Sequence, residues 1–301
     1  MRKRICRSDA HAGGEEGAGA PRRPSALLAA AGVRPSKARG QNFLTQGAIA
    51  DRIVAAAELT ADDEVIEIGP GLGILSDRIL AHSIRRLCLI ELDSRLASQL
   101  RNRLEGTPGL EIIEADVLKR DLATVIRRPP VKILGNLPFN VAAAVLRKLS
   151  DDRELIARMV LMFQREVADR IRARPGDPDY AALSVYTALD WEIDRHFRVD
   201  AGSFHPRPKV DAEVLRFVSR ATPICEPRER QRVLDMIRAG FSSPRKTIRN
   251  ALGGALKLAA AQVQAALANS AIDARARAET LSAADFARLA RGFERYRSAR
   301  D

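Results

Sequence analysis

The stretch "EVIEIGPGLGILSDRIL", Glu64 to Leu80, decides the fold. A short apolar run of β type comes first, three glycines follow at Gly69, Gly71 and Gly73, and a helical pattern begins directly after them. Glycine at such a strand-to-helix turn permits a tight turn and lets the backbone approach a ligand closely. The stretch therefore predicts a buried strand, a ligand-binding loop and a helix, in that order.

The same alternation of strand and helix patterns runs through residues 48–149. The β-type runs are "EVIEIG", "LCLIEL", "LEIIEAD" and "VKILGN", and the helical patterns "LSDRILA" and "SRLASQLRNRL" separate the first three. This alternation is typical of a doubly wound parallel sheet, in which ligands bind at the carboxyl ends of the strands. We therefore expect an α/β, Rossmann-like fold. Three later runs are expected to extend its sheet: "ARMVLMFQ", "AALSVYTALDW" and "KVDAEVLRFV".

Changes in composition divide the chain into three predicted regions. Residues 1–24 are rich in Gly, Ala, Arg and Pro without apolar periodicity, and are expected to form a disordered basic tail. A short helix is expected at residues 25–32, where the α/β domain of residues 25–220 begins. Beyond it the pattern becomes helical and basic, which predicts a small α-helical domain over residues 221–301.

Charge and cysteine content narrow the classes of function. The chain of 301 residues carries a net charge of +12, which attracts polyanions and favours a nucleic-acid partner; the alternative is a merely arginine-rich, solvated surface. Cys6, Cys88 and Cys225 are widely spaced and predict neither a disulfide framework nor a zinc site, so no metal is expected. No apolar run approaches the roughly 18–20 residues of a membrane span and no secretory signal is evident, so we expect a cytoplasmic protein.

The residues around the glycine loop indicate a nucleoside ligand. The dinucleotide fingerprint G-x-G-x-x-G would need glycine at Ile74, which argues against NAD. Acidic residues stand at or near three successive strand ends, Glu67, Glu91 and Asp116, and a carboxylate one strand beyond the loop can accept both hydroxyls of a ribose. No phosphate-binding GK[ST] follows. A nucleoside without phosphates suggests S-adenosylmethionine; the alternative is that these acids only cap turns.

The tetrapeptide "NLPF", Asn136 to Phe139, follows the fourth strand and so faces the same crevice. The exocyclic amine of a base is a poor nucleophile because its lone pair is delocalised into the ring. The side-chain oxygen of Asn136 and the carbonyl of Pro138 could accept its two hydrogens and aim the lone pair at a methyl group. Phe139 offers a flat face for a base that has left its helix, worth about 1–3 kcal/mol. The alternative is an Asn-Pro turn with a core aromatic.

Taken in order along the chain, these motifs resemble a known family. The segments "GQNFL" (residues 40–44), "IEIGPGLG", "IELD", "EAD", "GNLPFN", "FHPRPKVDAEV" (residues 204–214) and "FSSPRKTIRNAL" (residues 241–252) match those of the ribosomal RNA adenine dimethyltransferases. The resemblance covers residues 25–295 and is closest to the KsgA type, which modifies 16S rRNA of the small ribosomal subunit. It implies a Rossmann-like methyltransferase domain that uses S-adenosylmethionine, followed by a helical RNA-binding domain.

The resemblance also implies roles for single residues. It places Asn42 and Leu44 over the methionine end of the cofactor, Gly69 under it, Glu91 on the ribose and Asp116 on the adenine amine. The full predicted cofactor set is Asn42, Leu44, Gly69, Gly71, Glu91, Asp116 and Asn136. It adds Phe204 as a second aromatic beside the target base, so the predicted catalytic set is Asn136, Pro138, Phe139 and Phe204.

A basic segment after the predicted sheet carries the RNA contacts that the resemblance implies, by Arg245, Lys246 and Arg249. The alternative reading of such a charge run is a solvated helix face. Two positions depart from the family pattern: Phe139 stands where tyrosine is usual, which removes a phenolic hydroxyl, and Pro244 stands where arginine is usual, which removes one charge.

The expected function is transfer of methyl groups to N6 of two adjacent adenosines in 16S rRNA. A role in small-subunit biogenesis is also expected, with the small-subunit precursor as partner. Two alternatives remain at this stage. One is an assembly or checkpoint factor that acts mainly by binding the small subunit, and the other is a 23S rRNA adenine-N6 methyltransferase. We expect a monomer.

Overall fold

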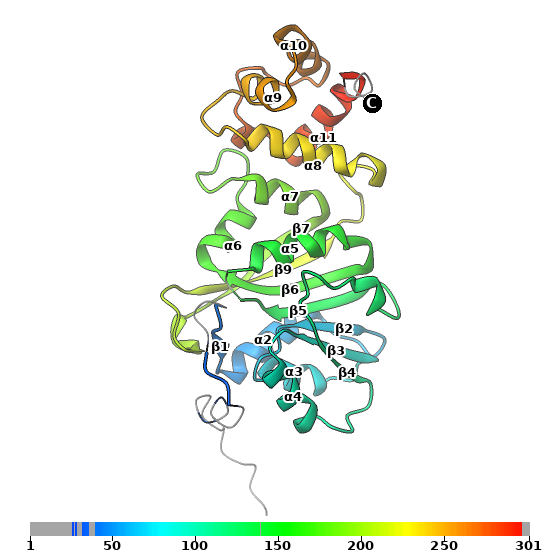
Figure 1. The fold of residues 1–301 in the computed structure, drawn as a ribbon, viewed down its shortest axis with the longest axis vertical. Helices are drawn as coiled ribbons and strands as arrows, with labels where there is room; N and C mark the ends of the chain where they lie inside the picture. The colour runs from blue at the N-terminus through cyan, green and yellow to red at the C-terminus, as the bar shows by residue number, and fades with distance from the viewer. Residues whose placement is uncertain (1–25, 27, 29–31, 36–39, 139, 297–301) are drawn as a thin grey trace, which may run out of the picture.

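The computed structural model of the chain describes residues 26, 28, 32–35, 40–138 and 140–296. A seven-stranded sheet with the order β4-β3-β2-β5-β6-β9-β7 forms its centre (Figure 1). Its strands are β2 (Glu64–Ile68), β3 (Arg86–Glu91), β4 (Leu110–Glu114), β5 (Val131–Asn136), β6 (Ile156–Gln164), β7 (Trp191–Val199) and β9 (Ala212–Ser219). Neighbours from β4 to β6 run parallel, whereas β9 is antiparallel to both β6 and β7. The α/β prediction is confirmed.

Helices cover both faces of the sheet because its central strands present apolar side chains to each. One face packs against α2 (Gly47–Ala57), α3 (Ile74–Leu80) and α4 (Ser94–Arg103). The other packs against α5 (Ala142–Asp151) and α6 (Arg165–Arg172). In β2, Val65 joins the first apolar layer and Ile66 the second, as the alternation of side chains along a strand requires. A separate two-stranded sheet pairs β1 (Phe43–Leu44) with β8 (Phe204–His205).

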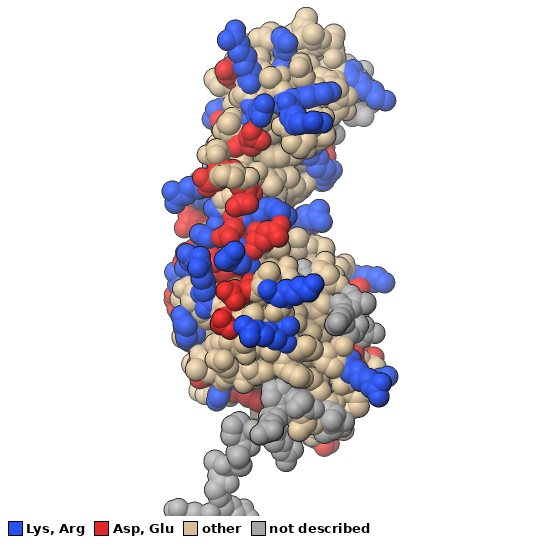
Figure 2. Space-filling view, turned by 90° about the vertical axis from the view of Figure 1, so that its left-hand side faces the viewer, with Lys and Arg blue, Asp and Glu red and all other residues tan. Residues whose placement is uncertain are grey.

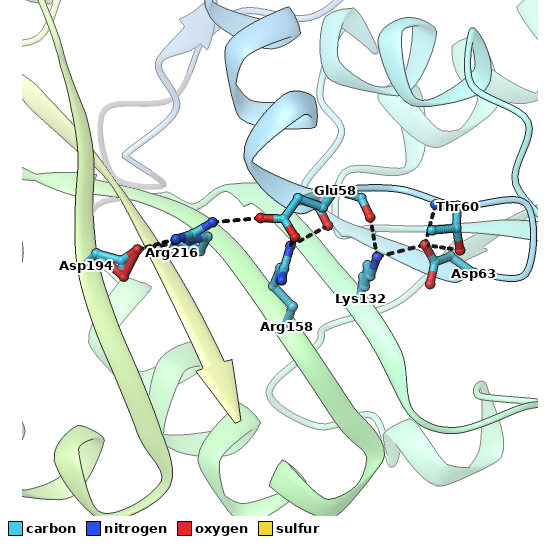
Figure 3. Close-up of polar contacts among 8 residues, drawn as sticks. Glu58, Thr60, Asp63, Lys132, Arg158, Asp194 and Arg216 are labelled. Carbon is cyan, nitrogen blue, oxygen red and sulfur yellow. Dashed lines mark hydrogen bonds and ion pairs between the residues drawn. The ribbon is translucent and has the colours of Figure 1, made fainter. Parts of the chain in front are cut away.

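A polar network fixes the carboxyl end of α2 to the sheet (Figure 3). Glu58, which ends the helix in the left-handed conformation, forms an ion pair with Arg158 of β6 at 2.7 Å and accepts a hydrogen bond from Arg216 of β9 at 2.8 Å. Its backbone carbonyl accepts from Lys132 of β5 at 2.5 Å, and Lys132 also pairs with Asp63 at 2.8 Å. The helix that follows β1 is therefore tied to three strands at its far end.

The helical end of the molecule is built from four helices: α8 (Pro227–Phe241), α9 (Ile248–Leu256), α10 (Ala260–Asn269) and α11 (Ala283–Gly292). Their common apolar cluster includes Val185 and Leu189 of helix α7 (Ala182–Asp190), which precedes the last strands of the sheet. The predicted boundary at residue 220 falls between the end of β9 and the start of α8. It stays a prediction, because the helical cluster draws on residues from both sides of it.

A buried ion pair joins the two parts. One terminal nitrogen of Arg230, in α8, donates to Asp190 Oδ1 at 3.1 Å, at the end of α7, and the other lies 3.0 Å from Oδ2 as an ion pair. The second nitrogen also donates to the carbonyl of Ser150 in α5 at 3.0 Å. Burial raises the pKa of Asp190 to about 6, although Arg230 and Arg153 oppose the shift. Desolvation of the carboxylate thus outweighs its two cationic neighbours.

One predicted strand is wrong. The run "AALSVYTALDW" forms α7 rather than a strand, and β7 begins only at its last residue, Trp191. The apolar Val185 and Leu189 stand four residues apart on the buried side of a helix, and Ser184 accepts from the N–H of Ala181 at 3.0 Å at its start. The true edge strand, "WEIDRHFRV", was not predicted. The charged Arg195 interrupts its apolar series, and a bulge between Arg195 and Phe197 shifts its pairing with β9.

Two predictions concern the amino-terminal segment. The basic tail expected at residues 1–24 lies outside the described residues, and so does most of the helix expected at residues 25–32. Leu28 and Val33 are described and buried, in a small cluster with Phe43, Leu72 and Leu96.

Candidate active site

A pocket opens at the carboxyl ends of β3, β2 and β5, which are neighbours in the sheet. Three stretches supply most of its lining: residues 40–44, the glycine loop after β2 and the start of the NLPF loop after β5. Among the residues predicted from the sequence, the pocket brings together Asn42, Leu44, Gly69, Gly71, Glu91, Asn136 and Pro138. Topology explains this meeting, since parallel neighbours end at one edge.

The glycine loop needs glycine for two distinct reasons. Gly69 and Gly71 both have left-handed backbone conformations, with φ of +68° and +58°. A side chain at Gly71 would also place its Cβ 3.0 Å from the Phe43 ring, so the ring would have to shift to admit one. The sequence prediction did not single out Phe43, although it stands between two residues that it did.

Glu91 is held by the backbone at the end of β3. Its carboxylate accepts from the N–H of Gly71 at 3.0 Å and from the N–H of Asp93 at 2.9 Å, one on each oxygen. Burial raises the pKa of Glu91 above its usual range, and these backbone bonds oppose the shift. A carboxylate has about four lone-pair sites, so each oxygen keeps one for the hydroxyl of a ribose.

Glu67 also lines the pocket and is almost completely buried. Burial raises its pKa to about 8, while a 2.6 Å hydrogen bond from the hydroxyl of Ser76 opposes the shift. Asp77 and Glu91 raise the pKa further by charge repulsion. A buried carboxyl of this kind carries its proton at neutral pH unless a cation comes near.

Asn136 is oriented by the segment that covers the pocket. Its side-chain Nδ2 donates to the backbone carbonyl of Asn42 at 3.1 Å, so the amide nitrogen is engaged and Oδ1 is the acceptor that remains. The carbonyl of Pro138 accepts from the N–H of Val141 at 3.1 Å, which leaves it one lone pair. Asn136 Oδ1 and the Pro138 carbonyl, the two acceptors predicted for a target amine, can therefore each still accept a hydrogen bond.

Of the two aromatic residues predicted beside the base, the structure describes Phe204 but not Phe139. Phe139 lies outside the described residues. Phe204, in β8, is only 4% exposed and packs in the apolar layer with Leu44, its partner across the two-stranded sheet. Phe204 is not part of the pocket lining, so its stacking on a base stays a prediction.

Asp116 stands apart from the pocket that the other predicted residues form. Its Oδ1 accepts from the N–H of Leu118 at 2.9 Å, and its backbone carbonyl accepts from Lys119 and Arg120. This is the turn-forming role that the sequence left open as the alternative. The contact of Asp116 with adenine stays a prediction.

The predicted RNA contacts lie at the helical end, where α8 passes into α9. Arg245, Lys246 and Arg249 are exposed and form no ion pair with any other residue that the structure describes. The buried Ile248 anchors the segment, and its N–H donates to Ala276 at 2.7 Å. Figure 2 shows the face that lies at the left of Figure 1: basic side chains lie over the helical end, and acidic side chains gather across the middle, interspersed with basic ones.

The described residues show neither a metal centre nor a membrane-spanning helix. No group of three or more His, Cys, Asp or Glu side chains among them could hold a metal ion. No helix within the described ranges is long and apolar enough to cross a membrane.

The pocket suits S-adenosylmethionine on observations of its own. The glycine loop keeps side chains off its floor, Glu91 presents lone pairs for a ribose, and the described residues of the lining include no cluster of cations for a phosphate. Glu67 could lose its proton beside the positive charges of the methionine end.

Comparisons with known proteins show the family of the chain. The family model for ribosomal RNA adenine dimethylase matches residues 34–294. The ribosomal RNA small subunit methyltransferase A of Geobacter sulfurreducens is 42% identical over 265 residues, which cover 87% of this chain and 96% of that protein. That of Methylococcus capsulatus is 40% identical over 257 residues, 85% and 97% of the two chains.

Two solved structures are also similar. A dimethyladenosine transferase from Plasmodium falciparum has a TM-score of 0.71 at 25% identity and covers 84% of this chain and 98% of its own. The 23S rRNA methyltransferase ErmE has a TM-score of 0.64 at 29% identity and covers 84% and 100%. Because the family model spans most of the sequence and relatives of 40% identity extend over nearly their whole lengths, the chain belongs to the ribosomal RNA adenine dimethylase family.

Proposed function

We propose that this chain dimethylates N6 of two adjacent adenosines in 16S rRNA of the small ribosomal subunit. Membership of the family makes the chain an S-adenosylmethionine-dependent rRNA adenine dimethyltransferase. The single observation that carries the assignment of its chemistry is the bond from Asn136 Nδ2 to the carbonyl of Asn42, which leaves Oδ1 as a hydrogen-bond acceptor at the edge of the pocket.

The residues of the pocket divide the work of holding the methyl donor. Asn42 and Leu44 cover the methionine end, Gly69 and Gly71 form the floor, and Glu91 accepts the ribose hydroxyls. Asp116 is proposed to reach the adenine amine with the oxygen that Leu118 does not use. When bound, S-adenosylmethionine supplies an electrophilic methyl group on a sulfonium.

The acceptors after β5 prepare the target amine. Asn136 Oδ1 and the Pro138 carbonyl accept the two hydrogens of N6, which favours a more pyramidal nitrogen with its lone pair directed away from the ring. Fixed acceptors stabilise this arrangement without the reorganisation that water would need. For the second methylation one acceptor must yield its place to a methyl group.

The aromatic residues are proposed to hold the adenine after it leaves the RNA stack. Phe139 and Phe204 would contact its two faces, each stacking contact being worth about 1–3 kcal/mol. Phe204 is buried, so the base reaches it only if the side chains around it shift. Phenylalanine in place of the usual tyrosine at residue 139 keeps this stacking.

The helical end is proposed to grip folded RNA through its phosphates. Arg245, Lys246 and Arg249 are exposed and carry no ion pair to the rest of the described chain, so their charges are available. The preference for the small subunit is supported by the 42% identity to a small subunit methyltransferase, against 29% to a 23S enzyme. We further propose the division of labour at residue 220, a monomer and a cytoplasmic location.

The direct test is methyl transfer from labelled S-adenosylmethionine to small subunits that lack the modification, followed by nucleoside analysis of the rRNA. We expect N6,N6-dimethyladenosine at two adjacent positions with the wild-type chain and a rate of formation lower by about 10²–10³ with Asn136→Ala. Large subunits serve as the matched control substrate. Methylation of the large subunit alone would identify a 23S enzyme, and tight binding of small subunits without methyl transfer would identify an assembly factor.

A further inference from the structure

The cover of the cofactor pocket is joined to the segment that carries Phe204. Across the two-stranded sheet, Phe43 pairs with His205 and Leu44 pairs with Phe204. The next residue, Thr45, donates twice to the carbonyl of Ser203: its backbone N–H at 2.9 Å and its side-chain hydroxyl at 2.9 Å. One carbonyl oxygen therefore fastens the end of β1 through both its lone pairs.

The cover itself contacts the pocket on its other side. Residues 40–44 form part of the lining, Asn42 accepts from Asn136, and Phe43 packs against the backbone of Gly71. A molecule that enters the pocket must therefore press on, or be closed in by, the same segment that Thr45 fastens.

The segment beyond Ser203 is fixed to the sheet in its turn. The N–H of Ser203 donates to Asp200 at 2.9 Å, and the carboxylate of Asp211 accepts from Ala201 at 3.0 Å. The carbonyl of Asp211 accepts from the N–H of Arg165, which follows the end of β6. These bonds hold residues 200–203 to the sheet. The bonds from Thr45 to Ser203 attach the pocket cover, residues 40–44, to this segment.

We propose that Thr45 is a positioning residue that makes the binding of the methyl donor and of the target adenosine cooperative. The inference rests on the proposed function, because it takes Phe204 as a wall of the base site. With the cover closed over the donor, β1 holds β8 and Phe204 in place for the base. By thermodynamic linkage, bound RNA must then tighten the donor site by the same factor.

The test measures this coupling with S-adenosylhomocysteine, which fills the donor site without transferring a methyl group. Its dissociation constant is determined for the wild-type chain alone and in the presence of saturating unmodified small subunits. We expect about tenfold tighter binding with the subunits, within the range of ordinary coupling energies. Equal affinity in both conditions would overturn the proposal.

Two variants isolate the hydroxyl. Thr45→Val keeps the branched shape and the backbone bond but removes the side-chain donor, whereas Thr45→Ser keeps the donor. We expect the coupling factor of Thr45→Val to fall to about twofold or less and that of Thr45→Ser to stay near the wild-type value. A Thr45→Val variant that retains the full factor would refute the role of the hydroxyl.

A measurement without a variant guards against misfolding. In hydrogen exchange on the wild-type chain, S-adenosylhomocysteine alone should slow the backbone amides of residues 203–205, which do not line the pocket. No change there would contradict the link. Failure of the proposed function is distinguishable, because it would appear as absence of dimethyladenosine in the methylation assay, whatever the coupling.

Discussion

Asn136 and Asn42 lie 94 residues apart in the chain, yet the side-chain amide of the first donates to the backbone carbonyl of the second at 3.1 Å. One bond thus connects the loop that is to act on the target amine with the segment that covers the methyl donor. Because the bond uses the amide nitrogen Nδ2 of Asn136, the amide oxygen Oδ1 is the atom that can accept a hydrogen bond from a substrate. The orientation of Asn136 is therefore set by the fold before any substrate binds.

Replacement of Asn136 by alanine should abolish most activity. The variant loses an acceptor that is preorganised for the reacting amine, and losses of this kind cost about 10²–10³ in kcat. Single-turnover methylation of unmodified small subunits measures the effect. Subunit affinity should change less than threefold or so, since phosphate contacts dominate it; an equal loss in affinity and in rate would contradict a role in the chemical step.

Glu91→Gln should weaken binding of the methyl donor. Glutamine keeps the shape but presents an amide NH₂ where one oxygen now accepts a backbone N–H, so the pocket loses an acceptor and gains a clash of donors. We expect the dissociation constant of S-adenosylhomocysteine to rise about tenfold or more, in line with about 1.4 kcal/mol per factor of ten. Calorimetric titration checks this against Glu105→Gln, a matched change at an exposed position.

Glu67 should make the stability of the protein depend on pH between about 5 and 8. Its pKa of about 8 in the folded chain exceeds the ordinary value of 4.5, so the folded state binds more protons in this window. The free energy of unfolding should therefore fall as the pH rises from 5 to 8. In Glu67→Gln this component vanishes, so urea titrations at pH 5.5 and 8 should show a smaller fall than in the wild type.

The exposed cations before and at the start of α9 should raise the affinity for RNA and make that affinity depend on salt concentration. Joint replacement of Arg245, Lys246 and Arg249 by alanine should weaken binding of small subunits and flatten its dependence on salt, by about 0.7–0.9 of logarithmic slope per lost phosphate contact. Binding of S-adenosylhomocysteine should not change. Arg101→Ala, on the exposed part of α4, is the matched control; an unchanged salt slope in the triple variant would place the RNA elsewhere.

Arg230→Met should destabilise the chain strongly. The replacement leaves the carboxylate of Asp190 buried without its principal partner, and loss of one member of a buried pair costs about 3–5 kcal/mol. Chemical unfolding measures the loss. Arg228→Met, two residues away in the same helix, removes an arginine whose ion-pair partner among the described residues is the exposed Glu226, and should cost less than about 1 kcal/mol.

Local patterns in the sequence predicted much of the fold because its central strands are short, buried and followed by glycine or amide turns. The stretch from Glu64 to Leu80 forms β2, the glycine loop and α3 as expected. The error at α7 has a local cause, since "SVYT" has the residue types of a strand while its apolar positions have helical spacing. There the tertiary contacts with the helical cluster outweighed local preference.

The sequence allowed prediction of those site residues that lie in motifs at the carboxyl ends of the strands. Glu91 and Asn136 lie where parallel neighbours bring them, whereas Asp116 turned out to be engaged in its own turn. The bonds between Thr45 and Ser203 join residues 158 positions apart, and no spacing in the sequence encodes them. The burial of Phe204 likewise follows from pairing with Leu44, which appears only in three dimensions.

Helix α7 precedes residue 220 in the chain but packs in the apolar cluster of the C-terminal helices, and this limits where the chain could be cut to engineer new specificities. The hydroxyl of Tyr180 donates to the carbonyl of Leu281 at 2.7 Å, and Val185 and Leu189 fill the same cluster as the helices that follow residue 226. A chimera joined at residue 220 would set the α7 of one parent against helices of the other and leave a mismatched core. A transplantable recognition module must therefore include α7, together with the three strands β7, β8 and β9 that lie between α7 and α8.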